Sequence, residues 1–336
     1  MKEVIIHRSI PQKIYLRVKA ALQRLKRPAI TFLLNRKQFS LSQSILLFGE
    51  VRGGTTWLME LLAKIPGMVT NFEPLHGTRG VVPQAQEWHW RPLLLKDHKN
   101  PEDHQLLEEI FTFRQHNWYT NSTLKFRHFI SPRFVLTKMV RGNQALPYVV
   151  ANMKLAHRPI LLIRHPISSC ISFLKAFGNY GHPQTWKIPP LNLHTQRNHQ
   201  YYDYLTSGHS DLAYRVARWC VNNAHILPRK EFKDKVVIVF YEDLLIDPEA
   251  EMKRIINELK IDIDQDAFLT SIEYRSPSSS NFKNQFNKDP NEQLSKGITA
   301  LSDEEKQEIQ DVFDHFDFKL YDAFTPYPKK DQLYSI

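Results

Sequence analysis

The chain has 336 residues, of which 42% are hydrophobic, so it can bury a sizeable core and is not predominantly disordered. The formal charge is +10, but residues 1–40 hold ten basic side chains and one acidic one, which leaves residues 41–336 nearly neutral. Two cysteines exclude a disulfide framework. No apolar run is as long as a membrane span, and the first residues lack the apolar stretch of a signal peptide. We therefore expect a cytoplasmic protein.

The first forty residues are a basic extension, which we separate from a single domain formed by residues 41–336. Apolar side chains recur at helical spacing between Ile14 and Leu25, basic side chains cover the rest of this predicted helix, and Pro28 interrupts it. Two interpretations stay open. The helix packs on the domain with its basic face in solvent, or residues 9–28 make peripheral contact with an anionic membrane or polymer.

Beyond residue 44, short apolar runs alternate with helical stretches, which is typical of parallel strands joined by crossover helices. The predicted strands are Ser44–Phe48, Met68–Phe72, Phe134–Met139, Ile160–Ile163 and Val236–Tyr241. The predicted helices are Thr55–Ile65, Leu146–Ala156, Pro166–Phe177 and Pro248–Leu259. The fold class is therefore α/β, with a central parallel sheet between two layers of helices. Residues 80–133 and 178–215 are weakly periodic, and we expect them to cover the carboxyl edge of the sheet, where substrates are often recognised.

The strongest motif follows the first predicted strand. A turn made of Arg52, Gly53 and Gly54 is followed by a helix that opens with Thr55, Thr56 and Trp57. Glycines let backbone N–H groups approach a ligand closely, and a helix N-terminus carries partial positive charge, so we expect a phosphate or sulfate here. The segment lacks the length and the lysine of a Walker A loop, which disfavours ATP hydrolysis. The alternative is an ordinary strand-to-helix turn that is capped by threonine.

A second motif follows the strand Ile160–Ile163. Arg164 ends this strand, Pro166 starts a helix, and Ser172 lies two turns further along. An arginine at the carboxyl end of a strand faces the crevice where open α/β sheets bind ligands, and its guanidinium suits a phosphate. By itself this pattern is weak, because an arginine at a strand end more often forms a surface ion pair.

Together, these two blocks resemble the sulfotransferases that use 3′-phosphoadenosine-5′-phosphosulfate (PAPS). The segment Arg52–Leu58 is similar to the family's loop for the 5′-phosphosulfate, with Gly53 where the family usually has serine. Arg164 and Ser172, eight residues apart, resemble its site for the 3′-phosphate. Residues 236–255 resemble the family's strand, its YEDL turn and the helix after it.

Near the end of the chain, Lys296 and Gly297 follow Ser295 and resemble the family's R-K-G loop, which closes over the 3′-phosphate. The resemblance covers residues 44–322. It implies a P-loop-type fold, PAPS as co-substrate with 3′,5′-adenosine bisphosphate (PAP) as product, and no metal. The cofactor-binding residues that it implies are Arg52, Gly53, Gly54, Thr55, Thr56, Trp57, Arg164, Ser172, Lys296 and Gly297.

The resemblance also bears on the acceptor. The histidine base of the small-molecule enzymes is absent here, because Val140 takes its place. Instead, residues 71–75 resemble the FEPL segment of carbohydrate O-sulfotransferases, whose glutamate is the proposed general base, and residues 138–141 resemble their K-x-V-R segment. This implies a hydroxyl acceptor on a sugar of a glycan or glycolipid.

The resemblance implies three catalytic residues. Glu73 accepts the proton of the hydroxyl, Arg52 stabilises the leaving phosphate, and Lys138 balances charge on the sulfonate. His76, three residues after Glu73, stays open as the alternative base.

Two other functions also stay open. Asp262 and Asp264 form an Asp-x-Asp pattern that suits the metal site of a nucleotide-sugar-dependent glycosyltransferase, while Ala267 stands where an EF-hand loop needs glycine. The net charge suits a non-catalytic binder of anionic polymers. However, residues 41–336 show no aromatic-flanked basic runs, which argues against a nucleic-acid partner.

Overall fold

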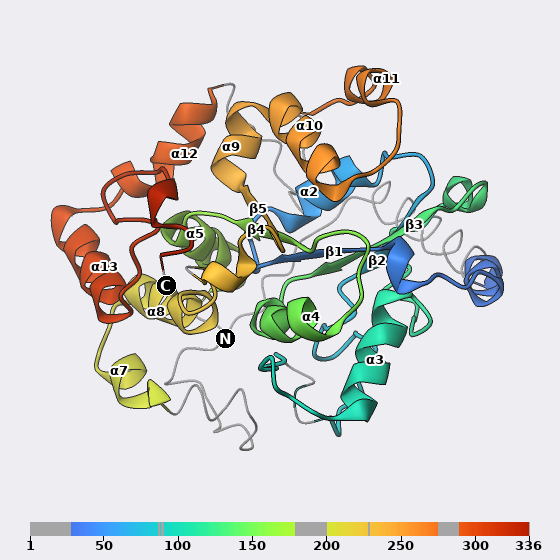
Figure 1. Ribbon diagram of the computed structural model, residues 1–336. Helices are drawn as coiled ribbons and strands as arrows, with labels where there is room; N and C mark the ends of the chain where they lie inside the picture. The colour runs from blue at the N-terminus through green and yellow to red at the C-terminus, as the bar shows by residue number, and fades with distance from the viewer. Residues whose placement is uncertain are drawn as a thin grey trace, which may run out of the picture.

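The computed structural model describes residues 28–86, 88, 91–178, 200–227, 229–274 and 289–335. At its centre lies a five-stranded sheet with the strand order β2-β3-β1-β4-β5, in which every pair is parallel (Figure 1). The strands are β1 (Ser44–Gly49), β2 (Met68–Phe72), β3 (Phe134–Met139), β4 (Ile160–Ile163) and β5 (Val237–Phe240). The predicted parallel α/β sheet is confirmed, with each strand in its expected place.

The helices that flank the sheet are α2 (Thr55–Leu62), α3 (Pro101–Phe111), α4 (Leu146–Asn152), α5 (Pro166–Phe177), α7 (Tyr202–Thr206), α8 (Asp211–Asn223), α9 (Tyr241–Ile246), α10 (Pro248–Leu259), α11 (Gln265–Thr270), α12 (Pro290–Thr299) and α13 (Asp303–His315). The predicted bounds of α5 and α10 are confirmed, whereas α2 and α4 end sooner than predicted. Tyr241, which we expected at the end of a strand and the start of a turn, instead begins α9. None of the helices in the described ranges is long and apolar enough to cross a membrane.

Both faces of the sheet are covered, because side chains along each strand alternate between two apolar cores. In β1, Leu46 and Phe48 pack with α3, α4, α5, α8 and α13, while Ile45 and Leu47 pack with α2, α9, α10 and α11 (Figure 1). A strand that is apolar on both sides reads as an unbroken hydrophobic run, which is why these strands could be recognised in the sequence.

Part of the basic extension lies against the sheet. Residues 28–36 are helical, and Ile30, Leu34 and Phe39 are buried in a cluster with Val69 of β2 and Val135 of β3. The predicted helix before Pro28 lies outside the described residues. The division of the chain at residue 40 therefore stays a prediction.

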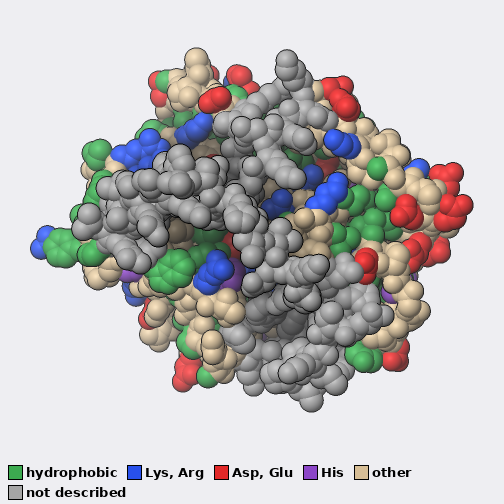
Figure 2. Space-filling view, turned by 180° about the vertical axis from the view of Figure 1, so that it is seen from behind, with side chains coloured by type: hydrophobic (Ala, Val, Ile, Leu, Met, Phe, Trp, Pro, Cys, Tyr) green, Lys and Arg blue, Asp and Glu red, His purple; other side chains and the backbone are tan. Residues whose placement is uncertain are grey.

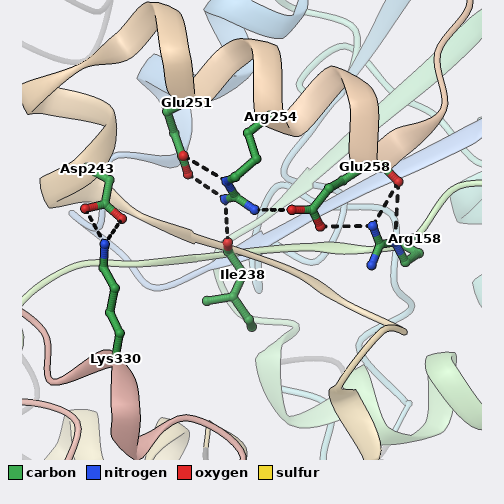
Figure 3. Close-up of polar contacts among 7 residues, drawn as sticks. All are labelled: Arg158, Ile238, Asp243, Glu251, Arg254, Glu258 and Lys330. Carbon is green, nitrogen blue, oxygen red and sulfur yellow. Dashed lines mark hydrogen bonds and ion pairs between the residues drawn. The ribbon is translucent and has the colours of Figure 1, made fainter.

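An ion-pair network fastens α10 to the edge of the sheet (Figure 3). Arg254 donates a hydrogen bond of 2.7 Å to the backbone oxygen of Ile238 in β5 and pairs with Glu251 and Glu258. Glu258 in turn accepts a bond of 2.9 Å from Arg158, just before β4. This side of the domain is therefore held by polar contacts as well as by the core.

The segment after α13 packs against the carboxyl ends of β4 and β5. The buried His165, two residues beyond the end of β4, contacts the backbone oxygens of Asp322 and Thr325 through Nε2 at 3.0 and 3.1 Å. The hydroxyl of Tyr321 donates to Oε2 of Glu242 at 2.9 Å, and Oε1 of Glu242 accepts from the backbone of His165 at 2.8 Å. Residues 321–325 thus close one wall of the sheet's carboxyl edge.

Candidate active site

The loop after β1 is shaped by two residues with a left-handed backbone. Arg52 has φ 66° and Gly54 has φ 98°, and the backbone N–H of Gly53 donates to the oxygen of Glu50 at 2.9 Å. A Cβ atom on Gly54 would lie 2.5 Å from the ring of Tyr241, so only glycine fits between the loop and α9. The first turn of α2 follows at once, which leaves its backbone N–H groups at the carboxyl edge of the sheet.

The two predicted phosphate motifs meet at this loop. Arg164 donates a hydrogen bond of 3.1 Å from its Nη1 to the backbone oxygen of Arg52, and its guanidinium lies 4.3 Å from the ring centre of Tyr241. Arg52 Nε donates to Ser172 Oγ at 3.0 Å. The structure therefore brings together Arg52, Gly54, Arg164 and Ser172 in one cluster between the carboxyl ends of β1 and β4. The chain runs from β1 to β2 on one side of this point and from β4 to β5 on the other, and open α/β sheets bind ligands at such a point.

The charge of this cluster fits an anionic ligand. Within the described part of the chain, neither Arg52 nor Arg164 forms a salt bridge, and Arg164 Nε is buried without a hydrogen-bond partner. Burial, and then the charge of Arg164, lower the pKa of Arg52. Two adjacent guanidiniums and a helix N-terminus suit phosphate oxygens, and a bound anion would relieve their mutual repulsion.

The two residues predicted to carry out catalysis beside this cradle form an ion pair. Lys138 in β3 is 1% exposed, and its Nζ lies 2.5 Å from Glu73 Oε1 and 3.2 Å from Thr56 Oγ1 in the first turn of α2. The ammonium also lies 4.5 Å from the ring centre of Phe72. Lys138 therefore connects the anion cradle to a carboxylate that follows β2.

The surroundings of Glu73 keep it ionised. Burial raises the pKa of this carboxyl group, but the charge and hydrogen bond of Lys138 outweigh burial and lower it overall. Tyr119 donates to Glu73 Oε2 at 3.2 Å, and burial together with the charge of Glu73 raises the pKa of that phenol. Glu73 is thus a carboxylate with two donors already in place.

His76, the alternative base, lies in the same cluster. Its ring packs edge-on against Tyr119 with ring centres 5.1 Å apart, and its Nδ1 accepts from the backbone of Thr78 at 3.3 Å. Burial, and then the charge of Arg141, lower the pKa of His76, so the ring is neutral near pH 7. Both candidates are therefore in a form that can accept a proton.

Sequence reasoning missed two parts of the site. Tyr119 lies in a segment without periodicity, so nothing in the sequence linked it to Glu73. Glu50 directly follows β1 and pairs with Arg91 through bonds of 2.5 and 3.1 Å, while Asn223 of α8 donates to it at 3.3 Å. The position of Glu50, directly before the Arg52 loop, was the one available signal for its importance.

The predicted loop at Lys296 and Gly297 is wrong, because both residues lie inside α12. Asp289 caps this helix by accepting from the backbone of Asn291, and Pro290 stands at its first position, where proline favours a helix. Lys296 is exposed, and a Cβ on Gly297 would lie 3.6 Å from Ser168 Oγ of α5. Their contact with a phosphate stays a prediction.

The Asp-x-Asp pattern has a structural use. The carboxylate of Asp264 accepts from the backbone of Ala267 at 3.1 Å and thereby caps α11. Among the described residues, no group of three or more His, Cys, Asp or Glu side chains is placed to hold a metal ion.

The model of the sulfotransferase family matches residues 44–265, about two thirds of the chain. Among solved structures, the chain is similar to the sulfotransferase domain of the Synechococcus PCC 7002 olefin synthase, with 18% identity over 83% of this chain and 95% of that one and a TM-score of 0.41. It is also similar to mouse sulfotransferase SULT7A1 complexed with PAP, with 13% identity, coverage of 82% and 84%, and a TM-score of 0.38.

These structural similarities are distant, and no curated protein sequence matches the chain significantly. The assignment rests on the family model, whose matched segment contains the Arg52 loop, Glu73, Lys138, Arg164 and Ser172. The chain belongs to the sulfotransferase family, as its sequence motifs predicted.

Proposed function

We propose that this protein transfers a sulfuryl group from PAPS to a hydroxyl group on a sugar, with Glu73 as the general base. The observation that carries this proposal is the position of Lys138, whose buried ammonium is bonded both to Thr56 in the anion cradle and to the carboxylate of Glu73. A base and an anion cradle that are both bonded to one cation are the two parts that sulfuryl transfer requires.

The chemistry divides between these two parts. A bond forms between the acceptor oxygen and sulfur while the bond between sulfur and the phosphate oxygen breaks, so negative charge develops on the leaving phosphate. Arg52 and the first turn of α2 stabilise this charge, and Arg164 with Ser172 binds the remaining phosphate. Glu73 accepts the proton of the hydroxyl group.

The proposal of a sugar acceptor is supported by the segments around Glu73 and Lys138, which resemble carbohydrate O-sulfotransferases in sequence. Both segments come together in the structure as an ion pair. The position where the small-molecule enzymes have a histidine base is Val140, whose side chain is buried.

The test uses labelled PAPS and a panel of glycans. We expect Glu73→Gln to transfer sulfate at least about 100-fold more slowly than the wild type while PAP binds with unchanged affinity, because a general base contributes to the transition state. Glu231→Gln removes an exposed carboxylate from another ion pair and is the matched control. Full activity of Glu73→Gln would show that Glu73 is not the base and would favour His76. Failure of the wild type to bind PAP at millimolar concentration would disprove the proposed function.

A further inference from the structure

A second basic pocket adjoins the nucleotide cradle. It is lined by Arg91, by Arg215 and Arg218 of α8, by Phe173 of α5, and by Glu50. Glu50 also lines the small cavity that reaches Gly53 and Arg164, so the two sites share a wall. None of the three arginines has a part in the nucleotide cradle described above.

The charge of this pocket is not balanced by the carboxylate that lines it. Glu50 accepts two hydrogen bonds from Arg91, of 2.5 and 3.1 Å. Arg215 forms no salt bridge within the described ranges, and its Nη2 is buried without a hydrogen-bond partner there. The guanidinium of Arg215 lies 4.3 Å from the ring centre of Phe173. Arg215 is thus a half-buried cation on the ring of Phe173, and leaving a buried polar group without a partner costs free energy. The site is therefore incomplete without an anion.

The arginines of this pocket also affect one another and a further arginine electrostatically. Burial lowers the pKa of Arg218, and the charges of Arg91 and Arg215 lower it further, against the opposing effect of Tyr214. Burial and then the charge of Arg91 lower the pKa of Arg141, which itself lies within electrostatic reach of Glu73. Arg91 therefore acts electrostatically both on Arg218 in the pocket and on Arg141.

Figure 2 shows the charged side chains on one face of the molecule. Several Lys and Arg side chains lie toward the middle of this face and others at its left side, while most Asp and Glu side chains lie around the rim. The domain beyond residue 40 is nearly neutral overall.

We propose that the pocket of Arg91, Arg215 and Arg218 binds an anionic group of the acceptor. The acceptor would then carry a carboxylate, sulfate or phosphate in addition to the hydroxyl group that is sulfated. This inference rests on the proposed function. Guanidinium groups bind all three anions through paired hydrogen bonds, and an anion would supply the missing partner of Arg215. The ring of Phe173 offers an apolar surface next to it.

Binding of p-nitrophenyl β-D-glucoside is compared by calorimetry with binding of its 6-sulfate, its 6-phosphate and the matching glucuronide, with and without saturating PAP. We expect at least one anionic compound to bind 10-fold or more tightly than the neutral glucoside. Arg215→Gln should weaken that binding about 10-fold, because it removes a hydrogen bond to a charged group. Arg215→Lys should restore part of the affinity, and the three anions identify which headgroup the pocket prefers.

The controls separate this inference from the proposed function. Arg114→Gln removes an exposed arginine from another ion pair and should leave all affinities unchanged. Equal binding of neutral and anionic compounds, or binding of none of them, would overturn the anion pocket even where PAP binds normally. A loss of PAP affinity in Arg215→Gln as large as its loss of anion affinity would also overturn it. Failure of the wild type to bind PAP would count against the proposed function instead.

Discussion

Arg52 and Ser172 lie 120 residues apart in the chain, and the guanidinium Nε of the first donates a hydrogen bond of 3.0 Å to the hydroxyl of the second. By resemblance, the two residues serve different phosphates of PAPS. Because Ser172 accepts from the side chain that we propose stabilises the leaving group, we expect the two proposed phosphate sites to be coupled.

Replacement of Ser172 by alanine should therefore affect more than nucleotide affinity. We expect Ser172→Ala to weaken PAP binding about 10-fold, the value of one hydrogen bond to a charged group, and to lower kcat as well because Arg52 loses its support. Calorimetry with PAP and steady-state kinetics measure the two effects. Ser207→Ala, at an exposed serine after α7, is the control. An unchanged kcat in Ser172→Ala would show that this contact does not position Arg52.

Gly54 should tolerate no side chain. Gly54→Ala combines a backbone with φ 98° and a contact of 2.5 Å between the new Cβ and Tyr241. Gly208 has φ 93° with nothing within 4 Å of its Cβ position, so Gly208→Ala isolates the backbone strain, about 1–2 kcal/mol. We expect Gly54→Ala to be the less stable variant in urea and to lose PAP affinity, whereas Gly208→Ala should bind PAP normally. Equal stability of the two would mean that Tyr241 moves aside freely.

The pair of Lys138 and Glu73 should be strongly coupled in stability. Lys138→Met leaves a buried carboxylate without its cation, and we expect a loss of roughly 3–5 kcal/mol in the free energy of unfolding. The double variant Lys138→Met/Glu73→Gln removes both charges and should be more stable than Lys138→Met alone. Urea unfolding of the wild type, both single variants and the double variant gives the coupling energy. Additive losses would show that the ion pair contributes little.

Two buried groups behind the cradle should oppose each other as the pH changes. Burial lowers the pKa of His165 from 6.5 to about 4, although the backbone oxygens of Asp322 and Thr325 act in the opposite direction. Burial raises the pKa of Glu242 from 4.5 to about 7. Between about pH 4.5 and 6.5 the unfolded chain protonates His165 more than the folded one, so this group favours folding as the pH rises. Glu242 stays protonated in the folded chain only, so it favours folding as the pH falls.

In each single variant only one of the two groups still titrates, so the free energy of unfolding should follow the pH dependence of that group. Relative to the wild type, Glu242→Gln should gain stability from pH 4.5 to 6.5 at about 1.4 kcal/mol per pH unit, and His165→Gln should lose stability at a similar rate. Chemical denaturation at four pH values measures both slopes. Parallel curves for all three proteins would disprove the opposed pKa shifts.

The parallel sheet could be predicted from the sequence for a physical reason, because strands buried on both faces are unbroken apolar runs. A glycine-rich turn that leads into a helix indicates an anion-binding N-terminus, and the phosphate contacts of Arg52, Arg164 and Ser172 stay predictions. The contact of Tyr119 with Glu73 joins an unpatterned segment to a strand end, and only the folded chain reveals it. Lys296 was misplaced because similarity to a loop motif outweighed the helix signal of Asp289 and Pro290.

The contacts of residues 321–325 with His165 and Glu242 set a limit on how this enzyme can be shortened. The segment matched by the family model ends at residue 265. Beyond it, the backbone oxygens of Asp322 and Thr325 contact His165, the residue after Arg164. The hydroxyl of Tyr321 donates to Glu242 in α9. A shortened version that keeps only residues 44–265 would lack the wall behind the nucleotide site. We therefore expect that a fragment able to bind PAP has to extend some sixty residues beyond the segment that the family model matches.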